Sequence, residues 1–177
     1  MTEVVHFPET GLPLAEARAA LDAMRGKVFV NRSTGIAARL SSSAKGKLVS
    51  NKATGKSKAN GFTREQHNAM AARVGELFEV AGMVESRPDR GGDANILSIK
   101  RFAANVFFGE KGAVAWITVK ESKQHGHHIY SVEAIKLETL DRIVEVVSGN
   151  TPHASSVSLA KMIANADETV KGGGQML

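Results

Sequence analysis

Apolar residues recur at the three- and four-residue spacing of a helix in two parts of the chain. The first part follows Pro13, a residue favoured in the first turn of a helix, and stops at Gly26. The second begins at Thr63, where Thr63-Arg-Glu-Gln66 fits a capping box, and stops at Gly82. Its apolar stripe consists of Met70, Val74, Leu77, Phe78 and Ala81. The pattern therefore predicts helices over 13–25 and 63–81.

Beyond residue 82 the spacing changes to the two-residue alternation of β-strands. Strands are expected over 96–102, 113–120 and 127–136, with a further one opening at Val84, and residues 27–31 also have strand composition. Residues 106–112 and 121–126 then connect the strands of an antiparallel meander. The first twelve residues are expected to be irregular, and the stretch between residues 36 and 62 mostly loop with one short helix.

The strand over 113–120 indicates how the sheet divides polar from apolar residues. One face carries Ala115, Ile117 and Val119, and the other carries Val114, Trp116, Thr118 and Lys120. The sheet is therefore expected to be apolar on one side and mixed towards one end of the other. This gives an α+β fold, with N-terminal helices packed on an antiparallel sheet. The expected divisions are a lead-in and helix over 1–26, a main domain over 27–137, and a peripheral helical tail over 138–177.

Charge is distributed unevenly along the chain. The stretch from Arg25 to Arg64 contains ten of the 23 Lys and Arg residues and no Asp or Glu, which leaves 13 cations against 18 carboxylates elsewhere. Its lysines alternate with serines, threonines and glycines, which suits a phosphate backbone: ammonium groups neutralise charge, and hydroxyls and backbone N–H groups donate hydrogen bonds. The alternative is a solvated, flexible basic loop with no ligand.

Composition removes several classes of function. The chain has no cysteine, which excludes disulfides, thiolate catalysis and cysteine-based zinc sites. It has no apolar run near the length of a membrane span and no signal-peptide pattern at its start. We therefore expect a protein of the cytoplasm, of a host or a target cell, with no membrane partner.

Several polar residues are candidates for chemistry. His67 falls at the start of the second predicted helix, where the helix dipole favours the neutral imidazole of a general base; a hydrogen-bonded core histidine is the alternative. Arg101, Thr118 and Lys120 end neighbouring strands and could meet a phosphate. The alternatives are a lysine that protects a strand edge, for Lys120, and a surface ion pair, for Arg101. His125, His127 and His128 surround a predicted turn, but no further ligand stands near them in sequence to complete a metal site. Gly55-Lys56-Ser57 lacks the rest of a P-loop.

A set of motifs in fixed order points to a family. They are Lys47-Leu-Val-Ser50-Asn-Lys52-Ala-Thr-Gly-Lys56-Ser57, Asn60-Gly61-Phe62-Thr63-Arg-Glu-Gln-His67, Glu76-Leu77-Phe78-Glu-Val-Ala81, Pro88-Asp89-Arg90 with Asn95-Ile96, Arg101-Phe102, Ile117-Thr118-Val119-Lys120-Glu121 and Ile129-Tyr130-Ser131-Val132-Glu133. Over residues 27–137 the chain resembles a nuclease-like domain of the large polyvalent proteins of phages and mobile elements, assigned to the barnase/EndoU/colicin/RelE fold group.

The resemblance implies helices ahead of a four-stranded antiparallel sheet, and a metal-independent ribonuclease activity often used as a toxin. The chain departs from the family pattern at Arg87 and Lys100, where histidine is common. This departure weakens the case for a mechanism built on two histidines.

The expected function is an endoribonuclease that cleaves RNA by attack of the ribose 2′-OH on the adjacent phosphate, without metal or cofactor. His67 is the expected base or acid, with Lys56 and Ser57 beside it. Arg101 and Lys120 are expected to stabilise the phosphorane, with Thr118 and Tyr130 orienting the substrate. The residues expected to hold the RNA backbone are Lys45, Lys47, Lys52 and Arg87.

Two other functions stay open. The first is a non-catalytic nucleic-acid-binding module of a phage or mobile-element protein, which keeps the fold and the basic segment but performs no turnover. The second is a protein-interaction domain whose basic segment is masked by an acidic immunity or antitoxin protein.

Overall fold

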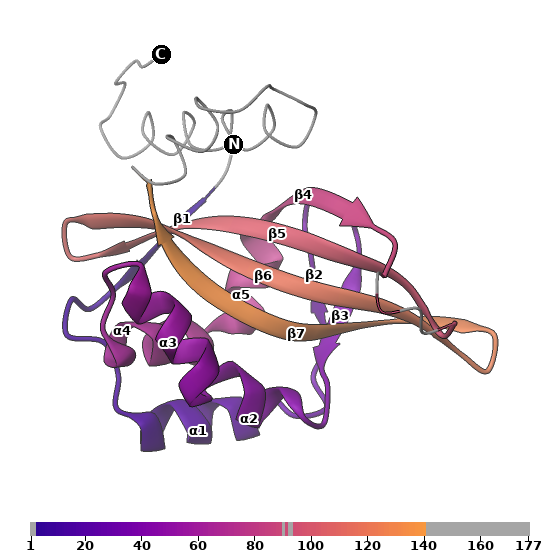
Figure 1. Ribbon diagram of the computed structural model, residues 1–177, viewed down its shortest axis with the longest axis horizontal. Coiled ribbons are helices and arrows are strands. Elements are labelled where there is room, and N and C mark those ends of the chain that lie inside the picture. The colour runs from indigo at the N-terminus through magenta and orange to yellow at the C-terminus, as the bar shows by residue number, and fades with distance from the viewer. Residues whose placement is uncertain (1–2, 90, 92–93, 141–177) are drawn as a thin grey trace, which may run out of the picture.

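The structure is a computed structural model that describes residues 3–89, 91 and 94–140 (Figure 1). Its helices are α1 (Leu14–Ala23), α2 (Ala44–Leu48), α3 (Asn51–Ala59), α4 (Arg64–Ala72) and α5 (Val74–Val80). Its strands are β1 (Val4–Phe7), β2 (Phe29–Val30), β3 (Ala37–Leu40), β4 (Gly82–Arg87), β5 (Ile96–Phe108), β6 (Lys111–Gln124) and β7 (His127–Thr139). The α+β class is confirmed. The expected tail over 138–177 begins within β7, and from residue 141 on it lies outside the described residues.

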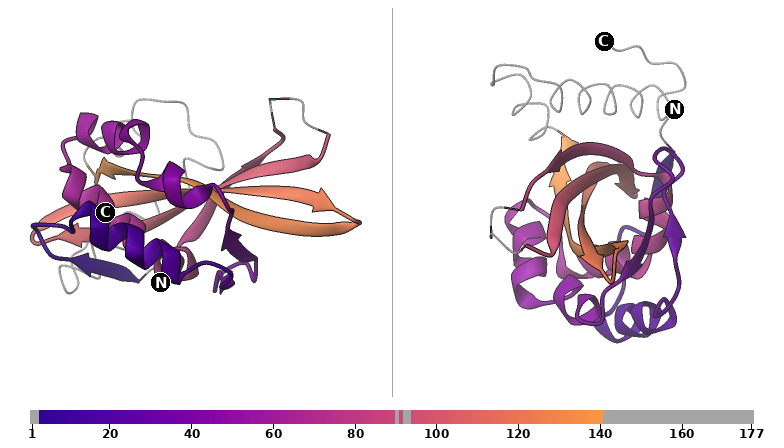
Figure 2. Two further views of the ribbon diagram at one scale, coloured as in Figure 1. Left: turned by 90° about the horizontal axis from the view of Figure 1, so that it is seen from below. Right: turned by 90° about the vertical axis from the view of Figure 1, so that its right-hand side faces the viewer.

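The sheet is larger than expected and mixed. Its strands run in the order β1-β5-β6-β7-β3-β2, and β4 also pairs with β5, which makes seven strands. The prediction of a four-stranded antiparallel meander is wrong: β4 to β7 do pair antiparallel in sequence order, but β1–β5 and β3–β7 are parallel pairs. The sheet is strongly curled, as the end-on view in Figure 2 shows.

The segments expected to be irregular are partly regular. Residues 4–7 form β1, and the basic segment forms β3, α2 and α3 in place of a loop with one helix. Helix α3 starts where the Ser50 hydroxyl accepts a hydrogen bond from the Ala53 N–H, and it buries Thr54 and Ser57. Its lysines lie on the exposed side. A segment that is polar on average therefore still forms a helix, because one of its faces is buried.

One face of the sheet, here called the inner face, packs on the helices. Phe102, Ile117 and Leu137 from three neighbouring strands are fully buried in one cluster with residues of α1, α4 and α5. The rings of Phe78 in α5 and Phe102 in β5 meet edge to face at 5.0 Å. The opposite, outer face carries Trp116, which belongs to a separate small apolar cluster. The predicted division of β6 into two faces is confirmed.

The helix predicted over 63–81 is two helices. Its capping box is present, since Thr63 and Gln66 exchange side-chain and backbone hydrogen bonds. The break falls at Arg73, whose guanidinium donates to the His6 carbonyl and to the Glu76 carboxylate and lies 4.7 Å from the centre of the Phe7 ring. Contacts with β1 therefore accompany a break that the periodicity does not show. Among the described residues no helix has the length and apolar character to cross a bilayer.

Helix α3 closes the exposed edge of β7. The Ser57 hydroxyl accepts from the Leu137 N–H at 3.0 Å, and the Asn60 side chain donates to the Leu137 carbonyl at 2.8 Å. Both backbone groups of this edge residue are therefore paired with side chains of the helix, as a neighbouring strand would pair them.

Replacing Gly11 with alanine is expected to destabilise the protein by about 2–4 kcal/mol. Gly11 has φ +77°, and an added Cβ would lie 2.2 Å from the backbone carbonyl carbon of Glu65, at the start of α4. Thermal unfolding measures the loss. Gly26→Ala is the matched control, because Gly26 has the same φ but no atom within 4 Å of the added carbon. Equal losses in the two variants would show that backbone strain, and not the contact with α4, decides.

Candidate functional site

His67 is a buried residue of the core. Its side chain is fully buried, with Nε2 2.7 Å from the Leu48 carbonyl oxygen and Nδ1 2.7 Å from Ser57 Oγ. Because the carbonyl can only accept, Nε2 carries the hydrogen and Nδ1 accepts from the Ser57 hydroxyl. Burial lowers the pKa of the imidazole more than the Leu48 hydrogen bond raises it.

Ser57 does stand beside His67, as expected, but both side chains have all their partners inside the protein. A general base must reach the proton that it abstracts, and this imidazole has no surface open to a substrate. The geometry is that of a structural histidine. His67 and Ser57 are therefore not proposed as catalytic groups.

Replacing His67 with alanine is expected to lower the free energy of unfolding by about 2–4 kcal/mol, because it opens a cavity, removes the acceptor of the Ser57 O–H and removes the donor to the Leu48 carbonyl. Urea unfolding measures the change. His125→Ala, at an exposed turn, should cost less than about 0.5 kcal/mol. Unchanged stability together with a loss of RNA cleavage would restore the catalytic assignment of His67.

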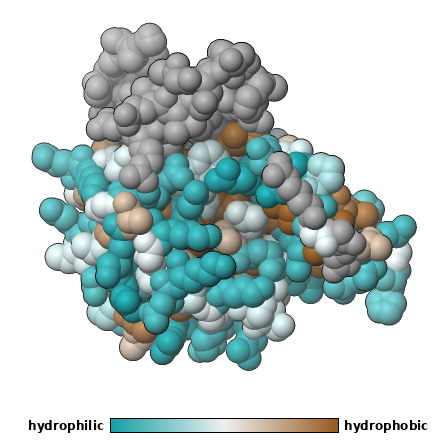
Figure 3. Space-filling model, in the orientation of Figure 1, coloured by the Kyte–Doolittle hydropathy of each residue, from teal (hydrophilic) through white to brown (hydrophobic). Residues whose placement is uncertain are grey.

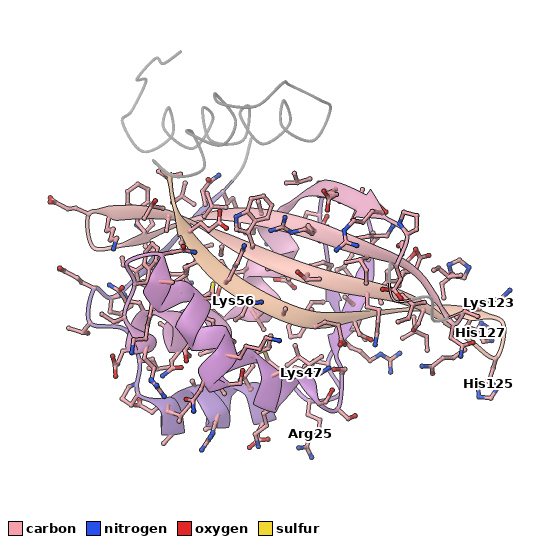
Figure 4. All side chains as sticks on the ribbon, viewed as in Figure 1. Arg25, Lys47, Lys56, Lys123, His125 and His127 are labelled. Carbon is pink, nitrogen blue, oxygen red and sulfur yellow. The ribbon has the colours of Figure 1, made fainter. Side chains whose placement is uncertain are left out.

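Three predicted site residues meet on the outer face of the sheet. Lys56 of α3, Arg101 of β5 and Thr118 of β6 line a groove of about 140 Å³, here called the Lys56 groove. Its other lining residues are Trp116, Ala134, Ile135 and Lys136. Figure 4 shows Lys56 on α3 beside β7, and in Figure 3 hydrophilic side chains cover the surface around α3. The fold thus collects cations that the sequence separates by up to 80 positions.

Lys120 and Lys47 lie outside this groove and share a different partner. Their ammonium groups lie 3.7 Å and 3.2 Å from the same oxygen of Glu133. Of the other expected RNA contacts, Lys45 pairs with Asp22, Arg87 with Glu85, and Lys52 is exposed on α3. Exposed ion pairs are weak, so these cations stay available to a polyanion.

Tyr130 lies in a third place, on the inner face of the sheet, where it packs against the main core. Its hydroxyl donates to Glu121 Oε2 at 3.1 Å, and the same oxygen is 2.7 Å from His128 Nδ1. The other oxygen, Oε1, accepts from the Ser98 hydroxyl at 2.7 Å and lies 3.5 Å from the Lys100 ammonium. We call these residues the Glu121 cluster: Ser98, Lys100, Glu121, His128 and Tyr130. Figure 1 shows that the end of the sheet that carries the β6–β7 turn extends beyond the helices, at the right of the view.

The Glu121 carboxylate is ionised at neutral pH. Its burial raises its pKa, but hydrogen bonds from Ser98, His128 and Tyr130 together with the Lys100 charge outweigh burial and lower the pKa to about 2. Burial and the hydrogen bond to Glu121 raise the pKa of Tyr130. Since an ionised carboxylate can only accept, His128 Nδ1 carries a hydrogen. No hydrogen bond joins its Nε2 to another described residue, and the side chain is 53% exposed.

Residues 14–130 match the model of the family described as large polyvalent protein-associated domain 3. The chain belongs to this family. None of the curated proteins and none of the solved structures matches it. The family match to a large polyvalent protein-associated domain spans α1 to Tyr130, and therefore includes the whole Glu121 cluster as well as Lys56, Arg101 and Thr118.

Most of the Glu121 cluster in this polyvalent protein-associated domain was not predicted. Its signal lies in the register of the β6–β7 hairpin, where Glu121 pairs with Tyr130 and Lys123 with His128. Cross-strand partners share a face, as do residues two apart on one strand, so the turn over 124–127 brings these side chains together. Counting outward from that turn would have found them. Within the described residues no three His, Asp or Glu side chains form a group able to hold a metal ion.

Proposed function

We propose that this domain is an endoribonuclease in which His128 is the acid–base group and Glu121 holds it in place. The observation that carries the proposal is the contact of 2.7 Å between His128 Nδ1 and Glu121. It fixes the tautomer and turns a basic Nε2 outwards, and a base oriented by a third group is the usual arrangement of acid–base catalysis.

The chemistry is a transesterification within the RNA. The 2′ oxygen bonds to the adjacent phosphorus while its proton passes to His128 Nε2, and the bond from phosphorus to the 5′ oxygen breaks. The imidazolium then returns a proton to the 5′ oxygen, which leaves a cyclic 2′,3′-phosphate and a free 5′-hydroxyl. The substrate supplies its own nucleophile, so the protein has to supply proton transfer and positive charge.

Lys123 is the cation placed to stabilise the phosphorane. It pairs with His128 across the hairpin, so the two side chains stand on the same face of the strands. Lys100 is less suitable, because it donates to Ser86 and its side chain is only 13% exposed. Figure 4 shows Lys123 at the end of the hairpin.

The test is incubation of the purified protein with total cellular RNA in the presence of EDTA, followed by mapping of fragment ends. We expect discrete fragments that carry cyclic phosphate ends. RNA that stays intact while the protein binds it at moderate salt would overturn the proposal.

The second candidate is a nucleic-acid-binding module without catalysis. The observation in its favour is the Lys56 groove, where Lys56 and Arg101 converge without an acid–base group among the lining residues. Under this alternative RNA binding falls steeply with salt, because phosphate contacts release counterions, and no cleavage accompanies it.

A further inference from the structure

The Lys56 groove is lined by several hydrogen-bond donors that have no acceptor among the described residues. Within the described part of the chain, neither Lys56 nor Arg101 forms an ion pair, and no hydrogen bond joins the Thr118 hydroxyl to another residue. Lys136 is the one groove cation that has a carboxylate partner among these residues, Glu138 at 2.8 Å. The groove therefore carries a net positive charge beside a free hydroxyl.

Two further features distinguish this groove from a scatter of surface lysines. The Arg101 guanidinium stacks on the Trp116 ring at 4.3 Å, which holds it in one orientation. Trp116 is only 6% exposed, and its indole Nε1 is buried with no acceptor among the described residues. A buried donor without a partner is costly, and a hydrogen-bond acceptor bound at this place would remove that cost.

We propose that the Lys56 groove binds one phosphate group of a nucleic-acid backbone. A phosphate supplies several acceptor oxygens, which match two cations, a hydroxyl and an indole N–H. A groove of about 140 Å³ admits one such group rather than a large ligand. Lys47 and Lys120 both pair with Glu133, which precedes the groove residue Ala134 on β7. Further cations next to the groove favour a polymer of phosphates over a single ion.

This site extends the proposed function and rests on it only for the identity of the polymer. Arg101 and Thr118 pair across β5 and β6, one residue and three residues from Lys100 and Glu121 respectively. The alternation of side chains puts the groove and the Glu121 cluster on opposite faces of the sheet. The phosphate in the groove is therefore a different one from the phosphate that is cleaved.

Single-stranded DNA tests the groove separately from cleavage, since it has the same phosphates but no 2′-OH. Trp116 is the one tryptophan of the chain, so its fluorescence reports on the groove. We expect a saturable change in emission when a short DNA oligonucleotide is added. Thr118→Val, which keeps the charge and the shape, should weaken binding roughly tenfold. Lys56→Gln should also weaken it and reduce the slope of log affinity against log salt by about 0.7.

Lys58→Gln is the matched control, because it removes the same charge from the exposed part of α3 but does not line the groove. Its effect should be much smaller than that of Lys56→Gln. Equal effects of the two variants, together with no effect of Thr118→Val, would show diffuse attraction and overturn the site. A response to inorganic phosphate that the oligonucleotide does not reproduce would also overturn it, in favour of a small anion.

A domain that binds DNA in the groove but does not cut RNA would uphold the groove and reject the endoribonuclease. A domain that cuts RNA, but whose DNA binding does not depend on Lys56 or Thr118, would support the endoribonuclease and reject the groove as a phosphate site.

Discussion

Replacing His128 with alanine is expected to lower the rate of RNA cleavage at least about a hundredfold, which is the usual contribution of a positioned acid–base group. The side chain is more than half exposed and lies outside the apolar core, so the fold should be unaffected. The measurement is the initial rate of cleavage of a short RNA in EDTA, together with the thermal unfolding midpoint of each variant.

His127→Ala is the control for this variant. His127 neighbours His128 on the same strand, and the alternation of side chains turns it to the other face. It should therefore cleave RNA at close to the rate of the unmodified protein. If the two variants lost activity equally, the effect would come from the hairpin end as a whole, and His128 would have no special role.

Replacing Glu121 with glutamine is expected to lower the rate of cleavage by roughly a hundredfold as well, with a smaller effect on KM. The substitution keeps the shape but removes the ionised acceptor that holds the hydrogen on His128 Nδ1. The imidazole can then adopt the other tautomer, in which Nε2 is protonated and cannot act as a base. The pH profile of the rate should change shape, and this would not follow from a general loss of stability.

The same variant should change how stability depends on pH. The folded-state pKa of Glu121 is about 2, below its ordinary value of 4.5, so the unfolded chain takes up this proton first as pH falls. The stabilisation is complete above pH 4.5 and is lost as pH falls towards 2. Thermal unfolding across this range should show a contribution in the unmodified protein that Glu121→Gln lacks. Parallel curves for the two proteins would show that the carboxylate is not held as described.

Local signals in the sequence predicted the elements that depend on local interactions. The capping box at Thr63 marks the start of α4, and the alternation from residue 113 to residue 120 assigns the two faces of β6. Both depend on neighbours within a few residues. The composition of residues 36–62, rich in lysine and glycine, predicts mostly loop with one short helix, whereas the structure has two helices there, one of them capped by Ser50.

The parts that could not be predicted depend on distant partners. Residues 4–7 and 37–40 carry no strong strand pattern, and they become β1 and β3 by pairing with β5 and β7. The role of His67 depended on Leu48 and Leu137, neither of which is polar in its side chain. The partners of its side chain are one backbone carbonyl, that of Leu48, and the Ser57 hydroxyl, which in turn accepts from the Leu137 N–H.

The candidate site shows the same limit. Lys56, Arg101 and Thr118 were selected from their residue types, and the structure does bring them together in one groove. Glu121 and His128 were not selected as a pair, because only the register of the hairpin shows that they meet. Sequence analysis could find the cations, which are conspicuous, but not a carboxylate and an imidazole joined across a turn.

The two parallel pairings affect how the chain reaches its native state. Val4 pairs with Asn105 and Ala38 with Tyr130. During synthesis β1 and β3 therefore leave the ribosome long before the strands with which they pair. Pairing between residues far apart in sequence makes folding slow, because closing the long loop between them lowers the conformational entropy of the chain before the contact can stabilise it. The nascent chain holds unpaired strands until β7 has emerged. The Glu121 cluster also needs β7, so the growing polypeptide lacks the cluster that we propose as the acid–base centre until most of the domain has been synthesised.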